Sequence, residues 1–170
     1  RFFLKQFLSP VYPAKADTPM KEKQRERCRQ FESRKQRLYT AMSCVLGDTL
    51  VPVLDFFRFS GHYYAISEVV PTHINGENKD GMTDEEKRQV LYHLANCLQR
   101  LHVQQVVHAD LKPEHILLSP DTWGYKVRLI DLDSGFLLDD PPPIGSGLEG
   151  IAAIEGEIPK HAENQGNQIA

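Results

Sequence analysis

Long apolar runs and a strong net charge are both missing from this 170-residue sequence. No stretch approaches the roughly 20 apolar residues that a membrane-spanning helix needs. The beginning lacks the basic and then apolar pattern of a secretory signal, and the formal net charge is only −3. These absences predict a cytoplasmic protein that does not enter membranes.

Cysteine is also scarce. Cys28, Cys44 and Cys97 are odd in number and widely spaced, so they form neither a disulfide framework nor a Cys-x-x-Cys metal knuckle. Free cysteines usually pack as small apolar side chains. We therefore expect all three thiols to be buried.

What the sequence does have is ordinary globular composition, with 41% hydrophobic and 25% charged residues. Short apolar or alternating runs predict strands at 2–7, 51–59, 63–70, 106–107, 116–118 and 127–130. Ser60 and Gly61 predict a hairpin, and residues 119–121 a turn. Together with two helices, these runs predict an α+β fold.

The first helix is expected to begin at Pro19. Its apolar residues recur at helical spacing, at Cys28, Phe31, Leu38, Met42 and Val45. Residues 21–37 carry a local excess of five positive charges. Such a run is usually a solvated helix face; binding of nucleic acid or an acidic partner is the less favoured alternative.

The second helix is marked by a capping box formed by Thr83 and Glu86. An apolar stripe is expected to face the core as far as His102; it consists of Val90, Leu91, Leu94, Leu98 and Leu101.

Two segments carry the chemistry, residues 108–115 (HADLKPEH) and residues 130–135 (IDLDSG). One carboxylate can orient a hydroxyl, a nearby lysine can neutralise a phosphate, and a second carboxylate can hold Mg²⁺. As isolated residues they would more often make a solvated salt bridge in a loop.

These motifs resemble the catalytic loop and the metal-binding segment of eukaryotic-like Ser/Thr protein kinases. The resemblance implies a kinase-like α+β fold that uses ATP and Mg²⁺ to phosphorylate a protein substrate. By position, Asp110 would be the catalytic base, Lys112 would contact the γ-phosphate and Asp131 would bind Mg²⁺.

The same resemblance makes Lys5 the lysine that pairs with the nucleotide phosphates. Glu32 is the candidate for the helix glutamate that turns inward to Lys5, with Glu22 and Glu26 as alternatives. A partner on the helix surface is the other interpretation of Glu32.

Residues 63–70 resemble the strand that leads to the inter-lobe hinge. Ser67 would then be the gatekeeper, and the backbone of Glu68 and Val70 would hydrogen-bond adenine. An ordinary sheet strand would carry the same sequence.

Three positions depart from the kinase pattern. Ala109 replaces an arginine that can pair with a phosphorylated loop. His115 stands where an asparagine usually binds a second metal, which predicts weaker metal binding or a shift towards Mn²⁺. Asp133 replaces a glycine, so the expected metal ligands are Asp131, His115 and Asp133.

The expected organisation is a partial N-lobe at 1–70, a hinge, helix and catalytic segment at 71–138, and an activation-loop-like, poorly ordered tail at 139–170. A glycine-rich loop before Lys5 and the remaining helical C-lobe are missing from the sequence. A fragment and a reduced fold are both open, and the missing C-lobe or another partner is expected to cover apolar faces.

Two other functions remain alternatives. A pseudokinase would use the same fold as a nucleotide-binding or scaffolding module. A metal hydrolase is weaker, because His102 and His108 are six residues apart and do not share one helical face. His108 is instead expected to pack beneath the catalytic loop.

Overall fold

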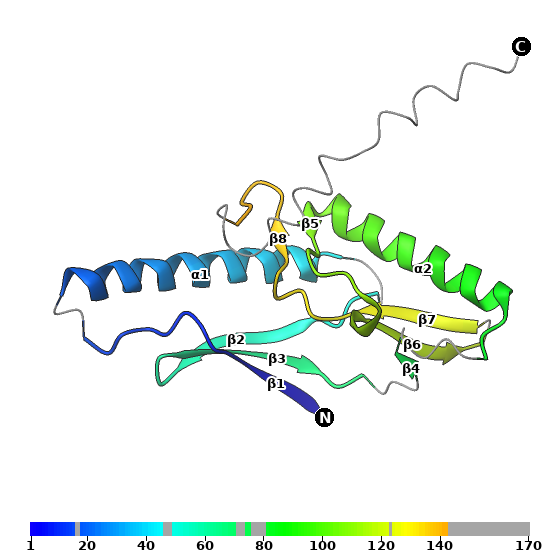
Figure 1. The fold of residues 1–170 in the computed structure, drawn as a ribbon, viewed down its shortest axis with the longest axis horizontal. Helices are drawn as coiled ribbons and strands as arrows, with labels where there is room; N and C mark the ends of the chain where they lie inside the picture. The colour runs from blue at the N-terminus through cyan, green and yellow to red at the C-terminus, as the bar shows by residue number, and fades with distance from the viewer. Residues whose placement is uncertain (16–17, 46–48, 71–73, 76–80, 123, 143–170) are drawn as a thin grey trace, which may run out of the picture. The chain divides into compact units, whose positions relative to one another are not determined.

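The computed structural model describes residues 1–15, 18–45, 49–70, 74–75, 81–122 and 124–142. Two α-helices and eight strands lie in these ranges (Figure 1), together with a short 3-10 helix at Pro113–His115. In chain order they are β1 (Phe2–Phe7), α1 (Pro19–Ser43), β2 (Val53–Phe59), β3 (His62–Glu68), β4 (Ile74–Asn75), α2 (Asp84–Val103), β5 (Val106–Val107), β6 (Ile116–Asp121), β7 (Gly124–Leu129) and β8 (Phe136–Leu137). The family resemblance and the fold agree on an α+β arrangement.

The first three strands form an antiparallel sheet in the order β1-β3-β2. The predicted hairpin joins β2 to β3, and both of its turn residues have positive φ, 49° at Ser60 and 82° at Gly61. Pairing of β1 with β3 places Lys5 opposite Ala65. This register brings Lys5 beside the strand that ends at the predicted hinge.

Helix α1 begins as predicted. The Thr18 side chain accepts a hydrogen bond from the Lys21 backbone, and Pro19 occupies the first turn. Cys28 and Phe31 pack against Phe7 of β1 and other sheet residues, in an aromatic cluster.

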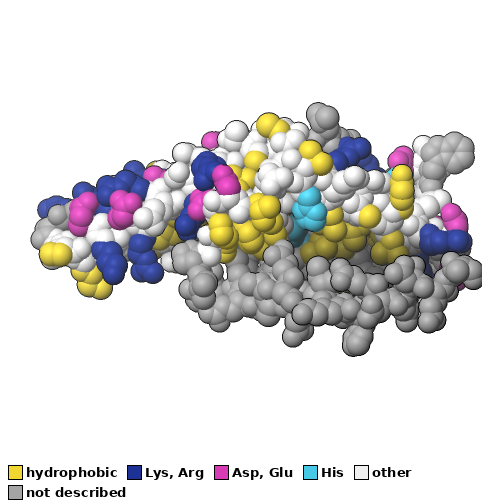
Figure 2. Space-filling view, turned by 90° about the horizontal axis from the view of Figure 1, so that it is seen from above, with side chains coloured by type: hydrophobic (Ala, Val, Ile, Leu, Met, Phe, Trp, Pro, Cys, Tyr) yellow, Lys and Arg dark blue, Asp and Glu magenta, His cyan; other side chains and the backbone are white. Residues whose placement is uncertain are grey.

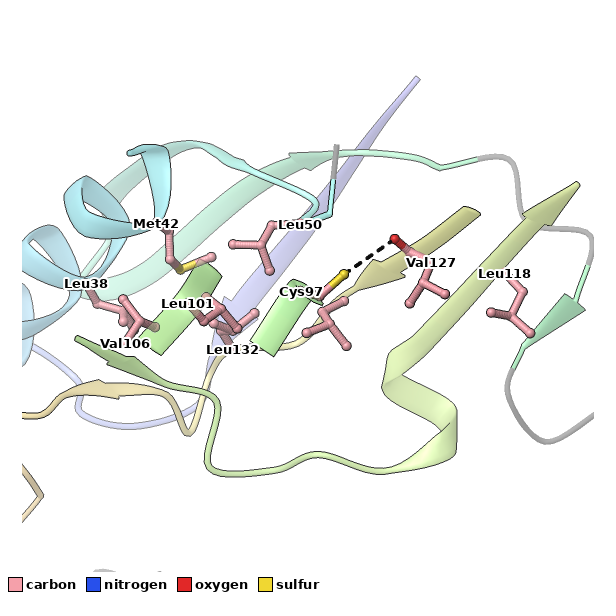
Figure 3. Packing of buried hydrophobic residues seen from close by; sticks show 10 residues of the cluster. Leu38, Met42, Leu50, Cys97, Leu101, Val106, Leu118, Val127 and Leu132 are labelled. Atoms are coloured by element: carbon pink, nitrogen blue, oxygen red, sulfur yellow. Dashed lines mark hydrogen bonds between the residues drawn. The ribbon is translucent and has the colours of Figure 1, made fainter. Parts of the chain in front are cut away.

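Helix α2 carries the predicted capping box of Thr83 and Glu86. It packs against β7, where the Cys97 thiol lies 3.9 Å from the Val127 carbonyl oxygen (Figure 3). An aliphatic core joins α2 to α1 and to the β6-β7 ribbon, and Leu101 is completely buried in it. Leu91, predicted to face this core, is instead 64% exposed, because only one stripe of α2 meets the ribbon.

Two further predictions were wrong in detail. Cys44 is exposed, since it follows the last turn of α1, whereas Cys28 and Cys97 are buried as expected. Residues 119–121 continue strand β6 rather than forming a turn, and Pro120 pairs with Tyr125. Proline is tolerated there because, among the described residues, β4 pairs only with Leu117 and Leu118, so Pro120 has a partner strand on one side.

Residues Arg1–Asp140 form one compact unit, which contains all the predicted site residues. Most of the predicted tail, 143–170, lies outside the described residues. Neither of the two helices is both long and apolar enough to cross a membrane, within the ranges given above.

Candidate active site

An apolar cavity of about 300 Å³ lies between the β1-β3-β2 sheet and the β6-β7 ribbon. Ser67, Glu68 and Val70 line it, and Leu117 of β6 also contributes to its wall. Lys5 and Asp131 line the same cavity. The structure thus brings the predicted hinge residues and two predicted phosphate-site residues to one cleft, of a volume suited to a small ligand.

Lys5 makes ion pairs across this cleft. Its Nζ atom lies 2.8 Å from Asp131 Oδ1 and 2.5 Å from Asp133 Oδ2. Partial burial works against both charges, but the ion pairs dominate, so the pKa of Lys5 is raised and the pKa of Asp131 is lowered. The ammonium and the Asp131 carboxylate are therefore both kept ionised at neutral pH.

The predicted pairing of Glu32 with Lys5 is wrong. Glu32 lies 3.3 Å from Arg58 Nη1 on β2, so its carboxylate faces the other edge of the sheet. The alternatives fare no better, since Glu22 and Glu26 both pair with Arg29. Glu22 and Glu26 therefore pair within α1, whereas Glu32 pairs with an arginine of β2.

His108 is buried beneath the catalytic loop, as expected. Its Nε2 lies 3.1 Å from the Ile130 carbonyl, while its Nδ1 accepts a hydrogen bond from the Asp110 backbone. A carbonyl only accepts and an N–H only donates, so these contacts require a neutral ring with its proton on Nε2. Burial accordingly lowers the pKa of His108. The ring ties the Asp110 loop to the strand that precedes Asp131.

His115 makes a second connection between the same two segments. Its Nδ1 lies 2.8 Å from the Asp110 carbonyl oxygen, and its Nε2 lies 3.4 Å from Asp131 Oδ2. The Lys112 ammonium lies 3.2 Å from the Asp110 carboxylate. Asp110, Lys112, His115 and Asp131 are thus brought together, although they come from segments about twenty residues apart.

Backbone conformation at this site is unusual. Ala109 and Asp131 have φ values of 62° and 61°, in the left-handed region that side chains other than glycine seldom adopt. Such conformations cost on the order of 1–3 kcal/mol each and persist where the surroundings impose them. Ala109 directly precedes Asp110, and Asp131 carries the other carboxylate.

Comparison with known proteins identifies the family. The sequence model of the family described as "Protein kinase domain" matches residues 17–143, which is most of the chain. This chain belongs to the protein kinase family. The match begins after β1 and does not include Lys5. The role expected for Lys5 therefore depends on its ion pairs with Asp131 and Asp133.

Individual kinases are similar at a lower level. Human ribosomal protein S6 kinase alpha-4 is 29% identical over 123 residues, which cover 68% of this chain and 16% of that protein. Serine/threonine-protein kinase PSK2 of Saccharomyces cerevisiae is 27% identical over 106 residues, which cover 56% of this chain and 9% of that protein. Human dual specificity tyrosine-phosphorylation-regulated kinase 4 is 32% identical over 89 residues, which cover 50% of this chain and 17% of that protein. The chain thus spans less than a fifth of the length of each of these kinases.

A kinase uses ATP and divalent metal, and the cleft can be tested for both. Its apolar walls and the Lys5 ammonium suit a nucleotide base and its phosphates. For the metal, Asp131 Oδ2 and His115 Nε2 face one another, while Asp133 is turned to Lys5. No group of three or more potential ligands forms among the described residues. Mg²⁺ needs only one or two carboxylates when phosphate oxygens supply other ligands, so the residues fit.

Sequence reasoning missed Lys35. This lysine is buried on the packed face of α1, and its Nζ donates a hydrogen bond to the backbone oxygen of Asp133. The signal was present, because Lys35 lies four residues after Phe31 and three before Leu38, within the apolar stripe of the helix.

Arginines on the basic outer face of α1 take part in ion pairs. Figure 2 shows Lys and Arg side chains interspersed with acidic ones along this helix. Arg34 and Arg37 both pair with Asp140, and Arg37 also pairs with Asp139. These contacts favour the interpretation as a solvated face over a surface for nucleic acid.

Proposed function

We propose that this kinase domain binds ATP in the cleft and transfers its γ-phosphate to a serine or threonine hydroxyl of a cytoplasmic protein. The observation that carries the proposal is the meeting of Lys5 and Asp131 at 2.8 Å, at the wall of the apolar cavity bordered by Ser67 and Val70. A base in the cavity would place its phosphates within reach of the Lys5 ammonium.

The catalytic loop, residues 108–115, would supply the groups for transfer. Asp110 would accept the proton of the attacking hydroxyl, and Lys112, 3.2 Å from it, would neutralise charge on the γ-phosphate. His115 holds the backbone of Asp110 and faces Asp131. The ring would thereby keep the Asp110 backbone next to the Asp131 side chain.

Mg²⁺ held by Asp131 and His115 would neutralise the charge that develops on the phosphate oxygens. The Lys5 ammonium would also neutralise phosphate charge, and its raised pKa keeps it ionised. When phosphates enter, the ammonium can exchange a carboxylate partner for a phosphate oxygen without losing its charge compensation.

The test compares Asp110→Asn and Asp131→Asn in the full chain, using labelled ATP, Mg²⁺ and serine- or threonine-containing peptides. We expect each change to lower transfer at least about a hundredfold, since a positioned acid or base contributes roughly 10²–10⁴ in rate. Asp110→Asn should leave ATP binding intact. Asp55→Asn, on the exposed side of β2, is the matched control. Equal transfer by all variants would refute the assigned roles.

A nucleotide-binding pseudokinase is the second candidate, favoured by His115 in the place of the usual asparagine. Its contacts with both Asp110 and Asp131 occupy the space between the two segments. His115→Asn separates the candidates. A large gain in transfer would indicate an impaired enzyme, whereas ATP binding without transfer in both forms would support a binding module.

A further inference from the structure

Lys35 places a charged group on the face of α1 where an apolar residue is expected. Only 7% of the residue is exposed, and its neighbours along the stripe are Phe31 and Leu38. A buried ammonium is costly unless other groups compensate for its lost hydration. Its retention at this position therefore requires specific partners.

Two kinds of partner surround the ammonium. The Nζ atom donates a hydrogen bond of 2.5 Å to the backbone oxygen of Asp133. It also lies 5.6 Å from the ring centroid of Phe7 and 5.9 Å from those of Phe31 and Tyr39. Cations within about 6 Å of aromatic rings are stabilised by the rings' negative faces. The three aromatic rings and the Asp133 carbonyl together stabilise the buried ammonium.

The carbonyl that Lys35 holds belongs to the short turn that carries Asp131. The Gly135 backbone donates a 3.0 Å hydrogen bond to the Leu132 oxygen, which closes the turn. A side chain at Gly135 would meet the Leu132 oxygen at 2.9 Å and the Val107 oxygen at 3.1 Å. Val107 therefore abuts the turn at Gly135, while Lys35 ties it to α1 at Asp133.

This arrangement differs from the usual kinase scheme, in which a glutamate of the helix pairs with the phosphate-binding lysine. Here Glu32 pairs with Arg58, and Lys5 pairs with Asp131 and Asp133. The hydrogen bond from α1 to the segment that carries Asp131 comes instead from Lys35 and is accepted by a main-chain oxygen.

We propose that Lys35 is a positioning residue, which fixes residues 131–135 against α1 and so sets the place of the Asp131 carboxylate for the metal-bound nucleotide. Lys5 holds the carboxylates of this segment from β1, and Lys35 holds its backbone from α1. The consequence for metal binding depends on the proposed function, whereas the tether itself does not.

The first measurement uses the full chain without nucleotide, with Lys35→Met, which keeps the length and apolar stem of the side chain but removes the donor. We expect amide hydrogen exchange within residues 131–135 to accelerate roughly tenfold, because a hydrogen bond from a charged donor is lost. Exchange in α2 should be unchanged.

The second measurement is ATP binding to the same proteins by calorimetry, with and without Mg²⁺. We expect the Mg²⁺ concentration for half-maximal enhancement of binding to rise about tenfold in Lys35→Met, as for other residues that orient a metal ligand. Binding without Mg²⁺ should change by less than about twofold, because the cavity walls are untouched. Lys35→Arg, which keeps a charged donor, should restore part of the Mg²⁺ response.

Lys23→Met is the matched control, since Lys23 is an exposed lysine on the same helix. Unchanged local exchange and an unchanged Mg²⁺ response in Lys35→Met would overturn the proposal. So would acceleration spread evenly over the whole chain, which would indicate general destabilisation. If the unmodified protein binds no ATP, the proposed function fails, and the exchange measurement still decides whether the tether exists.

Discussion

The two sides of the cleft differ in how they hold their polar groups. On the side of the catalytic loop, residues 108–115, His108 and His115 contact backbone atoms of Asp110, and His115 also faces Asp131. On the side of α1, the side chain that reaches the Asp131 segment is Lys35, whereas in the family scheme a helix glutamate pairs with the phosphate-binding lysine. Groups fixed by local backbone contacts follow the motif, whereas groups on α1 follow the packing of the helix on its sheet.

The largest expected effect on stability is in the aliphatic core that joins α2 to α1 and to β6 and β7. Leu101→Ala should lower the free energy of unfolding by about 2–5 kcal/mol, because Leu101 is completely buried and its removal leaves a cavity. Leu91→Ala, the same change on the exposed face of α2, should cost less than about 0.5 kcal/mol. Chemical denaturation measures both. Similar losses would mean that a partner or a different packing covers Leu91.

A smaller effect is expected from His108, the buried neutral histidine of the catalytic loop. Burial lowers its pKa below the ordinary value of 6.5, against the opposing hydrogen bond to Ile130. Above pH 6.5 the His108 ring is neutral in both the folded and the unfolded chain. As the pH falls below 6.5, the unfolded chain binds the proton at a higher pH than the folded chain does. Stability should therefore fall as the pH drops from 6.5 towards the pKa of the folded state, with a slope of at most about 1.4 kcal/mol per pH unit.

His108→Asn should remove this part of the pH dependence, which unfolding curves at several pH values will show. His102→Asn is the control, because His102 is exposed at the end of α2. A pH profile that is the same in the original chain and in His108→Asn would contradict the neutral, buried ring.

The smallest expected effect concerns α1, whose Glu32 does not pair with Lys5. Glu32→Gln removes a partly exposed ion pair with Arg58, which should cost only about 0.2–1 kcal/mol. ATP affinity should stay within about twofold, since Lys5 pairs elsewhere and the cavity walls are unchanged. Tenfold weaker ATP binding would instead show that Glu32 reaches Lys5 when nucleotide is bound.

Much of the fold follows from local signals. Pro19 after Thr18 begins α1, the capping box at Thr83 begins α2, and the pair Ser60-Gly61 makes the hairpin. Each signal acts within a few residues, so it can be read without knowledge of the rest of the chain.

The failures have a different origin. Leu91 has the right period for the core, but α2 meets the ribbon along a narrower stripe than the sequence suggests. Glu32 has the right chemistry for Lys5, but Arg58 of β2 lies closer. Both outcomes depend on how the helix is rotated against its neighbours, a property that helical periodicity leaves open.

By itself the sequence indicated the kinase family and singled out Asp110, Lys112 and Asp131 as candidate site residues, because their spacing within two short segments is nearly the whole of the signal. Only the tertiary structure decided which charges meet. Pairs such as Lys5 with Asp131, or Lys35 with the Asp133 carbonyl, join residues about a hundred positions apart. Their distances are set by the packing of α1 and β1 on the rest of the fold.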